Sequence, residues 1–161
     1  MSLKLAPTRL DEVAESVLAI IRPKAASGRV TLGSQLPSDL PPVLADRDRL
    51  AQILINLVDN AVKYTPEGGR LTLSARPVAG GRVEVTVADT GIGIPPADLP
   101  RITERFYRVD RARSRELGGT GLGLAIVKHL VLAHGGELWI ESEPGRGTTV
   151  RFTLPSSGPT A

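Results

Sequence analysis

The 161-residue chain has no cysteine, only two histidines and only 3% aromatic residues. The lack of cysteine excludes disulfides and thiolate metal sites, and it is typical of a protein from a reducing compartment. Two histidines are too few for a histidine-rich metal site. Because aromatic side chains are scarce, aliphatic residues must build the core. Hydrophobic residues make up 41% of the chain, which is enough for one domain of ordinary size.

Long apolar runs are also missing from the chain. No stretch approaches the roughly 20 apolar residues of a membrane-spanning helix, and the first 20 residues lack the pattern of a signal peptide. The chain is basic, with a net charge of +3, and six arginines lie between Arg101 and Arg115. Such a segment fits a nucleic-acid contact, a contact with a compact polyanion such as ATP, or a solvated loop. Composition leaves these alternatives open.

Hydrophobic periodicity predicts helices over residues 10–26, 46–64 and from the glycine-rich stretch near 118 to about 134. It predicts strands over 28–37, 70–76, 81–89, 137–142 and 148–155, with a proline-rich connection over 37–46. Helices and strands do not alternate strictly. The order therefore favours an α+β, two-layer α/β sandwich: a mixed, mostly antiparallel sheet with about three helices on one face. We expect the domain to span 10–154, after an upstream linker or expression scar (1–9) and before a flexible tail (155–161).

The helix predicted over 46–64, with Asp46 as its N-cap, carries a polar stripe opposite its apolar face. The stripe consists of Gln52, Asn56, Asp59, Asn60 and Lys63. A solvated outer face is the simple interpretation, but asparagine costs roughly 0.5–0.7 kcal/mol against alanine in a helix, and here two lie four residues apart. Amide oxygens suit Mg²⁺, which keeps waters and takes phosphate oxygens, and a lysine one turn later suits the same phosphates.

A second polar feature, "VADTGIGIP", ends a predicted strand. The carboxylate of Asp89 at this strand end can accept a hydrogen bond from the exocyclic amine of adenine. Gly91 and Gly93 would let the backbone approach a flat base without a Cβ clash. The alternative is an Asx-turn, in which Asp89 bonds only its own backbone.

The stretch "GGTGLGLAIVKHL" (118–130) places glycines ahead of a helix, as phosphate sites do. Gly119, Gly121 and Gly123 are spaced G-x-G-x-G after a charged loop, which excludes the dinucleotide-binding fingerprint that follows a strand. Leu124 stands where the phosphate-binding lysine of a P-loop would be. What remains is an arginine-bearing loop that leads into glycines at a helix N-terminus.

Four segments, "NLVDNAVKYT", "DTGIGIP", "ERFYRVD" and "GGTGLGLAIVKHLVLAHGG", resemble in order and spacing the N, G1, F and G2 boxes of sensor histidine kinases. The resemblance covers residues 10–154 and implies the catalytic and ATP-binding domain with the Bergerat fold (gyrase, Hsp90, histidine kinase, MutL). It implies ATP and Mg²⁺ as cofactors, with Asn60 and Asn56 as metal ligands.

Further roles follow from the resemblance. Lys63 would reach the phosphates, Tyr64 would lie beside adenine or ribose, Asp89 would accept from adenine N6, and Arg108 would contact the γ-phosphate. An ATP lid is implied at about 105–119. The catalytic set is then Asn56, Asn60, Lys63 and Arg108. The nucleotide-binding set is Asn56, Asn60, Lys63, Tyr64, Asp89, Gly91, Gly93, Ile94, Arg108, Gly119, Thr120, Gly121, Leu122 and Gly123.

The chain departs from the family pattern at several positions. Thr103 replaces an F-box phenylalanine, so lid packing would rest on Phe106 and Tyr107. Leu132 is apolar where the family often has a polar residue, so it is either core or a partner surface. No histidine lies in a phosphoacceptor context, and His129 and His134 are expected to be structural or exposed.

The expected function is therefore transfer of the ATP γ-phosphoryl group to a histidine on a separate dimerisation domain of the same parent kinase, with a response regulator as indirect partner. The expected chain is a monomer without nucleic-acid or membrane contact, in the cytoplasmic part of a membrane-anchored parent. Two alternatives stay open: a nucleotide-binding regulatory module without transfer, and an anti-sigma-type serine kinase of the same fold.

Overall fold

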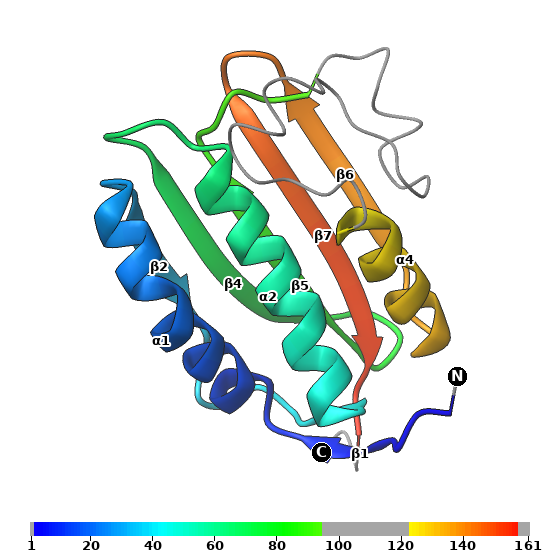
Figure 1. Ribbon diagram of the computed structural model, residues 1–161. Coiled ribbons are helices and arrows are strands. Elements are labelled where there is room, and N and C mark those ends of the chain that lie inside the picture. The colour runs from blue at the N-terminus through cyan, green and yellow to red at the C-terminus, as the bar shows by residue number, and fades with distance from the viewer. Residues whose placement is uncertain (1, 95–122, 158–161) are drawn as a thin grey trace.

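The computed structural model describes residues 2–94 and 123–157 (Figure 1). The helices are α1 (Leu10–Ser27), α2 (Arg47–Lys63) and α4 (Gly123–Ala133). The strands are β1 (Ala6–Thr8), β2 (Thr31–Gln35), β3 (Val43–Ala45), β4 (Arg70–Val78), β5 (Arg82–Asp89), β6 (Leu138–Glu143) and β7 (Gly147–Pro155). None of these described helices is long and apolar enough to cross a membrane.

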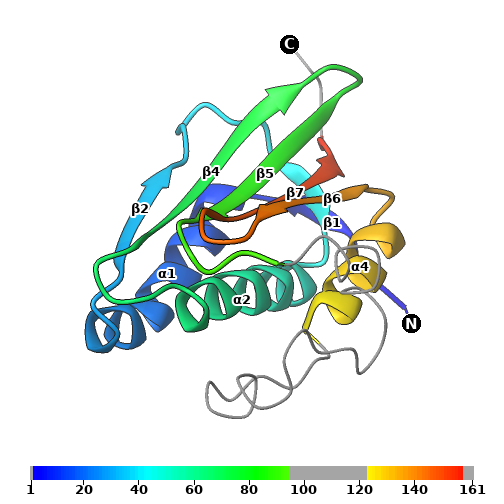
Figure 2. The same cartoon turned by 90° about the horizontal axis from the view of Figure 1, so that it is seen from above.

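Five strands form the main sheet in the order β2-β4-β5-β7-β6. β2 pairs with β4 in parallel, and the other neighbours are antiparallel. Seen from above in Figure 2, the sheet is one layer and the described helices form the other, all on the same face of the sheet. This is the two-layer α+β sandwich with a mixed, mostly antiparallel sheet that the sequence predicted.

The core lies between these two layers and is almost entirely aliphatic, as the composition required. Every second strand residue, such as Leu71 and Leu73 of β4 and Val85 and Val87 of β5, is buried beneath the helices, because successive side chains of a strand point to opposite faces. The apolar stripe of α2 is buried against them. Phe152 of β7 is the aromatic residue in this buried set.

Helix α2 begins where the sequence predicted. The side chain of Asp46 accepts hydrogen bonds from the backbone N–H groups of Asp48 (3.1 Å) and Arg49 (3.2 Å), which satisfies two of the unpaired donors of the first turn. Helices α1 and α2 pack side by side, with their C-terminal ends at the same end of the molecule (Figure 1). The C-terminal end of β5 lies at the same end of the molecule (Figure 1).

Two short strands were not predicted. Ala6–Thr8, expected to be linker, pairs with Val43–Ala45, which was expected to be part of a proline-rich connection. Three residues are too few to show a period-two pattern, so only the long-range pairing reveals β1 and β3. Ser156 and Ser157, in the expected tail, donate backbone hydrogen bonds to Gly81 and Pro42.

The two histidines and Leu132 lie on or near α4. Nδ1 of buried His134 lies 2.7 Å from the carbonyl oxygen of Leu130, and its Nε2 accepts a hydrogen bond from the backbone N–H of Asp46 at 3.2 Å. His134 therefore ties α4 to the N-cap of α2, the structural role expected for it, while His129 is exposed. Leu132 is 54% exposed, so it belongs to the surface and not to the core.

Candidate nucleotide-binding site

The sequence-predicted residues that the structure describes gather at one end of the molecule. Four parts of the chain meet there (Figure 1): the C-terminal turns of α2, the end of β5, the segment 89–94 that follows β5, and the turn between β6 and β7. The backbone N–H of Ile92 donates to the carbonyl of Tyr64 (3.1 Å), and the carbonyl of Ile92 accepts from Gly145 N–H (2.8 Å). The N–H of Ile94 donates to Ser142 Oγ at 2.7 Å. The segment is thus held between α2 and the β6–β7 turn.

The polar stripe of α2 is not a fully solvated face. All five of its side chains are half-buried, and Asn56 and Asn60 lie one turn apart on it. Asp59 Oδ2 lies 3.1 Å from Nζ of Lys63, and its Oδ1 accepts a hydrogen bond from Nζ of Lys24 on α1 at 2.7 Å. Burial acts to raise the pKa of Asp59, but the hydrogen bonds and charges of the two lysines outweigh it and hold that pKa below its usual value.

Asp89 is held by one carboxylate oxygen. Its Oδ1 accepts from the backbone N–H of Gly91 (2.8 Å) and from the N–H of Thr148 on β7 (3.2 Å). The first bond is the Asx-turn considered as an alternative, but the second comes from a neighbouring strand. Within the described part of the chain, no hydrogen bond reaches Oδ2. Burial raises the pKa of Asp89, and the two backbone hydrogen bonds offset this only in part.

Close contacts with neighbouring backbone explain why this segment has glycines. A Cβ on Gly91 would lie 2.5 Å from the carbonyl oxygen of Tyr64 and 2.7 Å from Asp89 Oδ1. Gly93 has φ +76°, and a Cβ there would collide with the carbonyl oxygen of Glu143. Both glycines thus allow close contacts between protein segments, and their role in shaping a site for a base stays a prediction from the sequence.

Part of the predicted site lies outside the described residues. This part comprises Arg108, the lid at 105–119, Gly119, Thr120, Gly121 and Leu122, together with Thr103, Phe106 and Tyr107. Gly123 is the first residue of α4, which agrees with the predicted position of the glycines at a helix N-terminus.

Sequence reasoning missed three residues that hold the site together. Lys24 binds Asp59 from α1, Thr148 binds Asp89 from β7, and Ser142 binds the Ile94 backbone from β6. Each is distant in sequence from its partner. No local sequence pattern points to these three residues, because the pairing of β5 with β7 that places Asp89 opposite Thr148 exists only in the folded chain.

The donor set fits a metal ion that needs few protein ligands. Among residues 2–94 and 123–157, no group of three or more His, Cys, Asp or Glu side chains is placed to hold a metal. Asn56 and Asn60 offer neutral amide oxygens beside a lysine. Mg²⁺ typically keeps several waters and takes phosphate oxygens as ligands, so this sparse set suits a magnesium–nucleotide complex better than an all-protein metal cage.

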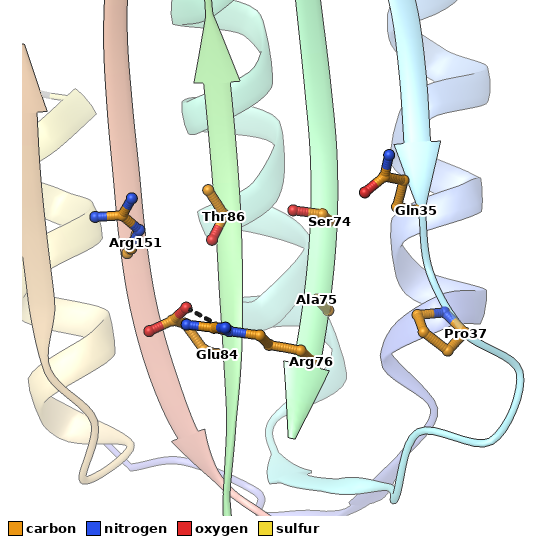
Figure 3. Close-up of a pocket in the computed structure, with 8 residues that line it drawn as sticks. All are labelled: Gln35, Pro37, Ser74, Ala75, Arg76, Glu84, Thr86 and Arg151. Atoms are coloured by element: carbon orange, nitrogen blue, oxygen red, sulfur yellow. Dashed lines mark hydrogen bonds and ion pairs between the residues drawn. The ribbon is translucent and has the colours of Figure 1, made fainter. Parts of the chain in front are cut away.

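A pocket of about 440 Å³ lies elsewhere, on the face of the sheet opposite the helices (Figure 3). It is lined mostly by strand residues, including Ser74, Thr86 and the Arg76–Glu84 ion pair (3.2 Å). Arg151 at its edge is paired with Glu141. The sheet separates this pocket from Asn60 and Asp89, and its cations are already paired, so we do not assign it to the nucleotide.

Comparison with known proteins identifies the family. Residues 45–158 match the model of the histidine kinase-, DNA gyrase B- and HSP90-like ATPases. The chain is 52% identical over 111 residues to the sensor histidine kinase WalK of Bacillus subtilis (strain 168), covering 68% of this chain and 18% of WalK.

Solved structures agree with this match. Full-length ShkA in complex with AMPPNP superposes with a TM-score of 0.86 at 38% identity, over 100% of this chain and 33% of that one. The mycobacterial sensor histidine kinase MprB gives 0.81 at 30% identity, over 96% and 99%. The chain thus spans well under half of WalK and of full-length ShkA. It belongs to the histidine kinase-, DNA gyrase B- and HSP90-like ATPase family and, within it, to the ATP-binding catalytic domains of sensor histidine kinases.

Proposed function

We propose that this chain binds Mg²⁺-ATP where α2 and β5 end, and that it transfers the γ-phosphoryl group to a histidine on a separate helical domain. The observation that carries the proposal is the arrangement of Asp89. Its carboxylate is fixed through Oδ1 to two backbone N–H groups, which orients Oδ2 as an acceptor at the same end of the fold as the polar stripe of α2. ShkA, solved with the ATP analogue AMPPNP, supports an adenine nucleotide as the ligand.

Each described residue has a defined task in this proposal. Asp89 accepts a hydrogen bond from the adenine amine, and Tyr64 and Ile94 flank the base or ribose. Lys63 approaches the phosphates, and Asn60 and Asn56 offer oxygen ligands to Mg²⁺. When bound, Mg²⁺ offsets negative charge on the phosphates, which is the main requirement of phosphoryl transfer. Arg108 and the glycines at 119, 121 and 123 are proposed from sequence to complete the phosphate contacts.

The phosphoacceptor is proposed to lie outside this chain. His134 is buried and bonded through both ring nitrogens, so it is not available as a nucleophile. We infer a catalytic domain at 10–154, extended by β1, with its lid at about 105–119. Its proposed partners are the histidine-bearing dimerisation domain of the parent kinase and, indirectly, a response regulator. The proposed location is the cytoplasmic side of a membrane-anchored parent.

Replacing Asn60 with alanine tests the metal assignment. The chain would be mixed with labelled ATP, Mg²⁺ and a purified histidine-bearing helical domain. We expect Asn60→Ala to abolish phosphorylation of that domain, while Gln52→Ala, on the same stripe two turns earlier, retains it. Transfer by Asn60→Ala at the wild-type rate would contradict the assignment. If the wild-type chain binds ATP but transfers no phosphoryl group, the result would favour a regulatory nucleotide-binding module. Label on a serine would favour a serine kinase.

A further inference from the structure

We propose that Asp59 and Lys24 are positioning residues for the proposed contact of Lys63 with phosphate. Asp59 holds the Lys63 ammonium until a phosphate binds it. Lys24 then keeps the charge of the Asp59 carboxylate paired. This inference rests on the proposed function, because it concerns how Lys63 reaches a nucleotide.

The geometry makes Asp59 the centre of a three-residue ion cluster. One oxygen, Oδ1, accepts from Nζ of Lys24 at 2.7 Å, and the other, Oδ2, lies 3.1 Å from Nζ of Lys63. The two lysines come from different helices, α1 and α2, and bind different oxygens of the same carboxylate. Lys63 can therefore leave without disturbing the bond to Lys24.

The three side chains differ in burial, and the burial of Asp59 sets the cost of leaving its carboxylate without a cation. The side chains of Asp59 and Lys63 are 21% and 22% exposed, and that of Lys24 is 53% exposed. A carboxylate in such a half-buried place is costly to leave without a cation. Because Lys24 remains on Oδ1, the cluster goes from one carboxylate with two cations to one carboxylate with one cation when Lys63 turns away. No charge is left unpaired at either stage.

The arrangement predicts opposite effects for its two supporting residues. Without Lys24, Asp59 would have Lys63 as its only cation in the cluster and would hold it more tightly, so nucleotide binding would weaken. Without the Asp59 charge, Lys63 would be released to the phosphates, so binding would be retained or strengthened. A simple clasp between α1 and α2 predicts something different: both substitutions would lower the free energy of unfolding, and neither would change the nucleotide affinity selectively.

Titration calorimetry with AMPPNP and Mg²⁺ tests this with Lys24→Gln, Asp59→Asn and the double variant. Because the Lys24 side chain is exposed, its ion pair with Asp59 is worth up to about 1 kcal/mol, so we expect Lys24→Gln to weaken binding by about two- to fivefold. Asp59→Asn should bind at least as tightly as the wild type. In the double variant the effect of Lys24→Gln should disappear, because its target is absent. Lys24→Arg should bind like the wild type.

Two controls separate this proposal from other causes. Arg22→Gln removes an exposed cation from the same helix and should leave the affinity within twofold of the wild type, which excludes a general charge effect. Urea unfolding of each variant measures the free energy of unfolding, which a simple clasp between α1 and α2 predicts to fall for Lys24→Gln and Asp59→Asn alike.

The outcomes also separate this proposal from the proposed function. If the wild type binds AMPPNP but Lys24→Gln binds equally well, or loses the same affinity when Asp59 is already replaced, the proposal is overturned while the proposed function stands. Weakening by Asp59→Asn only when Mg²⁺ is present would make Asp59 a metal-site residue and would also overturn it. A wild-type chain that binds no nucleotide would refute the proposed function and this inference together.

Discussion

Asparagine in place of Asp89 preserves the shape of the side chain while changing its hydrogen-bonding pattern. In the structure, Oδ1 accepts from the N–H groups of Gly91 and Thr148 at 2.8 and 3.2 Å. The amide oxygen of Asp89→Asn can accept both bonds, which directs the amide NH₂ to the place of Oδ2. If Oδ2 accepts from the adenine amine as proposed, the substitution sets a donor against a donor.

The size of the effect follows from the bond that is lost. A hydrogen bond to a charged group is worth about 1.5–3 kcal/mol, so at about 1.4 kcal/mol per decade the affinity for ATP should fall roughly 10- to 150-fold.

The substitution Asp89→Asn should not lower the free energy of unfolding. Burial raises the pKa of Asp89 above 3.8, so between the unfolded and folded pKa values the native state binds more protons than the unfolded state.

The sign of the pH effect follows from this difference. The Asp89 contribution lowers the free energy of unfolding as the pH rises through that window, and the penalty persists at neutral pH. Asp89→Asn removes the ionisation, so its free energy of unfolding at pH 7 should equal or exceed that of the wild type.

Calorimetry with ATP and with inosine triphosphate checks the binding, and urea unfolding at pH 3 to 7 checks the stability. Inosine triphosphate carries an acceptor oxygen where ATP carries the amine, so Asp89→Asn should lose ATP selectively and bind the inosine nucleotide relatively better. Asp89→Ala is the matched control, since it leaves the Gly91 and Thr148 donors without their acceptor and should lose stability as well. An unchanged ATP affinity in Asp89→Asn would refute the adenine contact.

Two further predictions concern the framework of the site. Gly91→Ala should lower the free energy of unfolding by about 1–3 kcal/mol, because its Cβ would press on the Tyr64 carbonyl and Asp89 Oδ1. Gly28→Ala, where the nearest atom to a Cβ is 3.6 Å away, should change it little; equal urea midpoints for both variants would contradict the packing argument. His134→Ala should cost about 1–3 kcal/mol through the unpaired Asp46 N–H, while exposed His129→Ala should not. Thermal unfolding measures both histidine variants, and a His134→Ala melting temperature equal to the wild type would contradict the link between α4 and α2.

Strong local periodicity explains which elements were predictable. The apolar stripe of α2, its Asp46 N-cap and the β4–β5 hairpin around Gly80 and Gly81 all express patterns within fewer than 20 residues, and the structure has them where they were predicted. β1 and β3 were missed because three-residue strands carry no period of their own. They exist through their mutual pairing and through the hydrogen bond from Thr8 Oγ1 to the carbonyl of Ala45.

The features of the candidate site also divide into those that the sequence predicts and those that depend on the tertiary structure. The sequence by itself determined the residue types: two asparagines one turn apart, a lysine at the next turn, an aspartate at a strand end and glycines around it. Helical and strand periods place such residues on a face or at an end without reference to the rest of the chain. The order of the motifs was sufficient to indicate the family.

Only the tertiary structure decided what surrounds those residues. The packing of α1 on α2 brings Lys24 to Asp59, and the pairing of β5 with β7 brings the Thr148 N–H to Asp89. These partners lie 35 and 59 residues apart in sequence. Contacts at that separation depend on how helices and strands pack in three dimensions, and no local pattern encodes the result. The motifs thus determine which functional groups the site contains. The ion pairing of Lys63 and the orientation of the Asp89 carboxylate depend on the assembled fold.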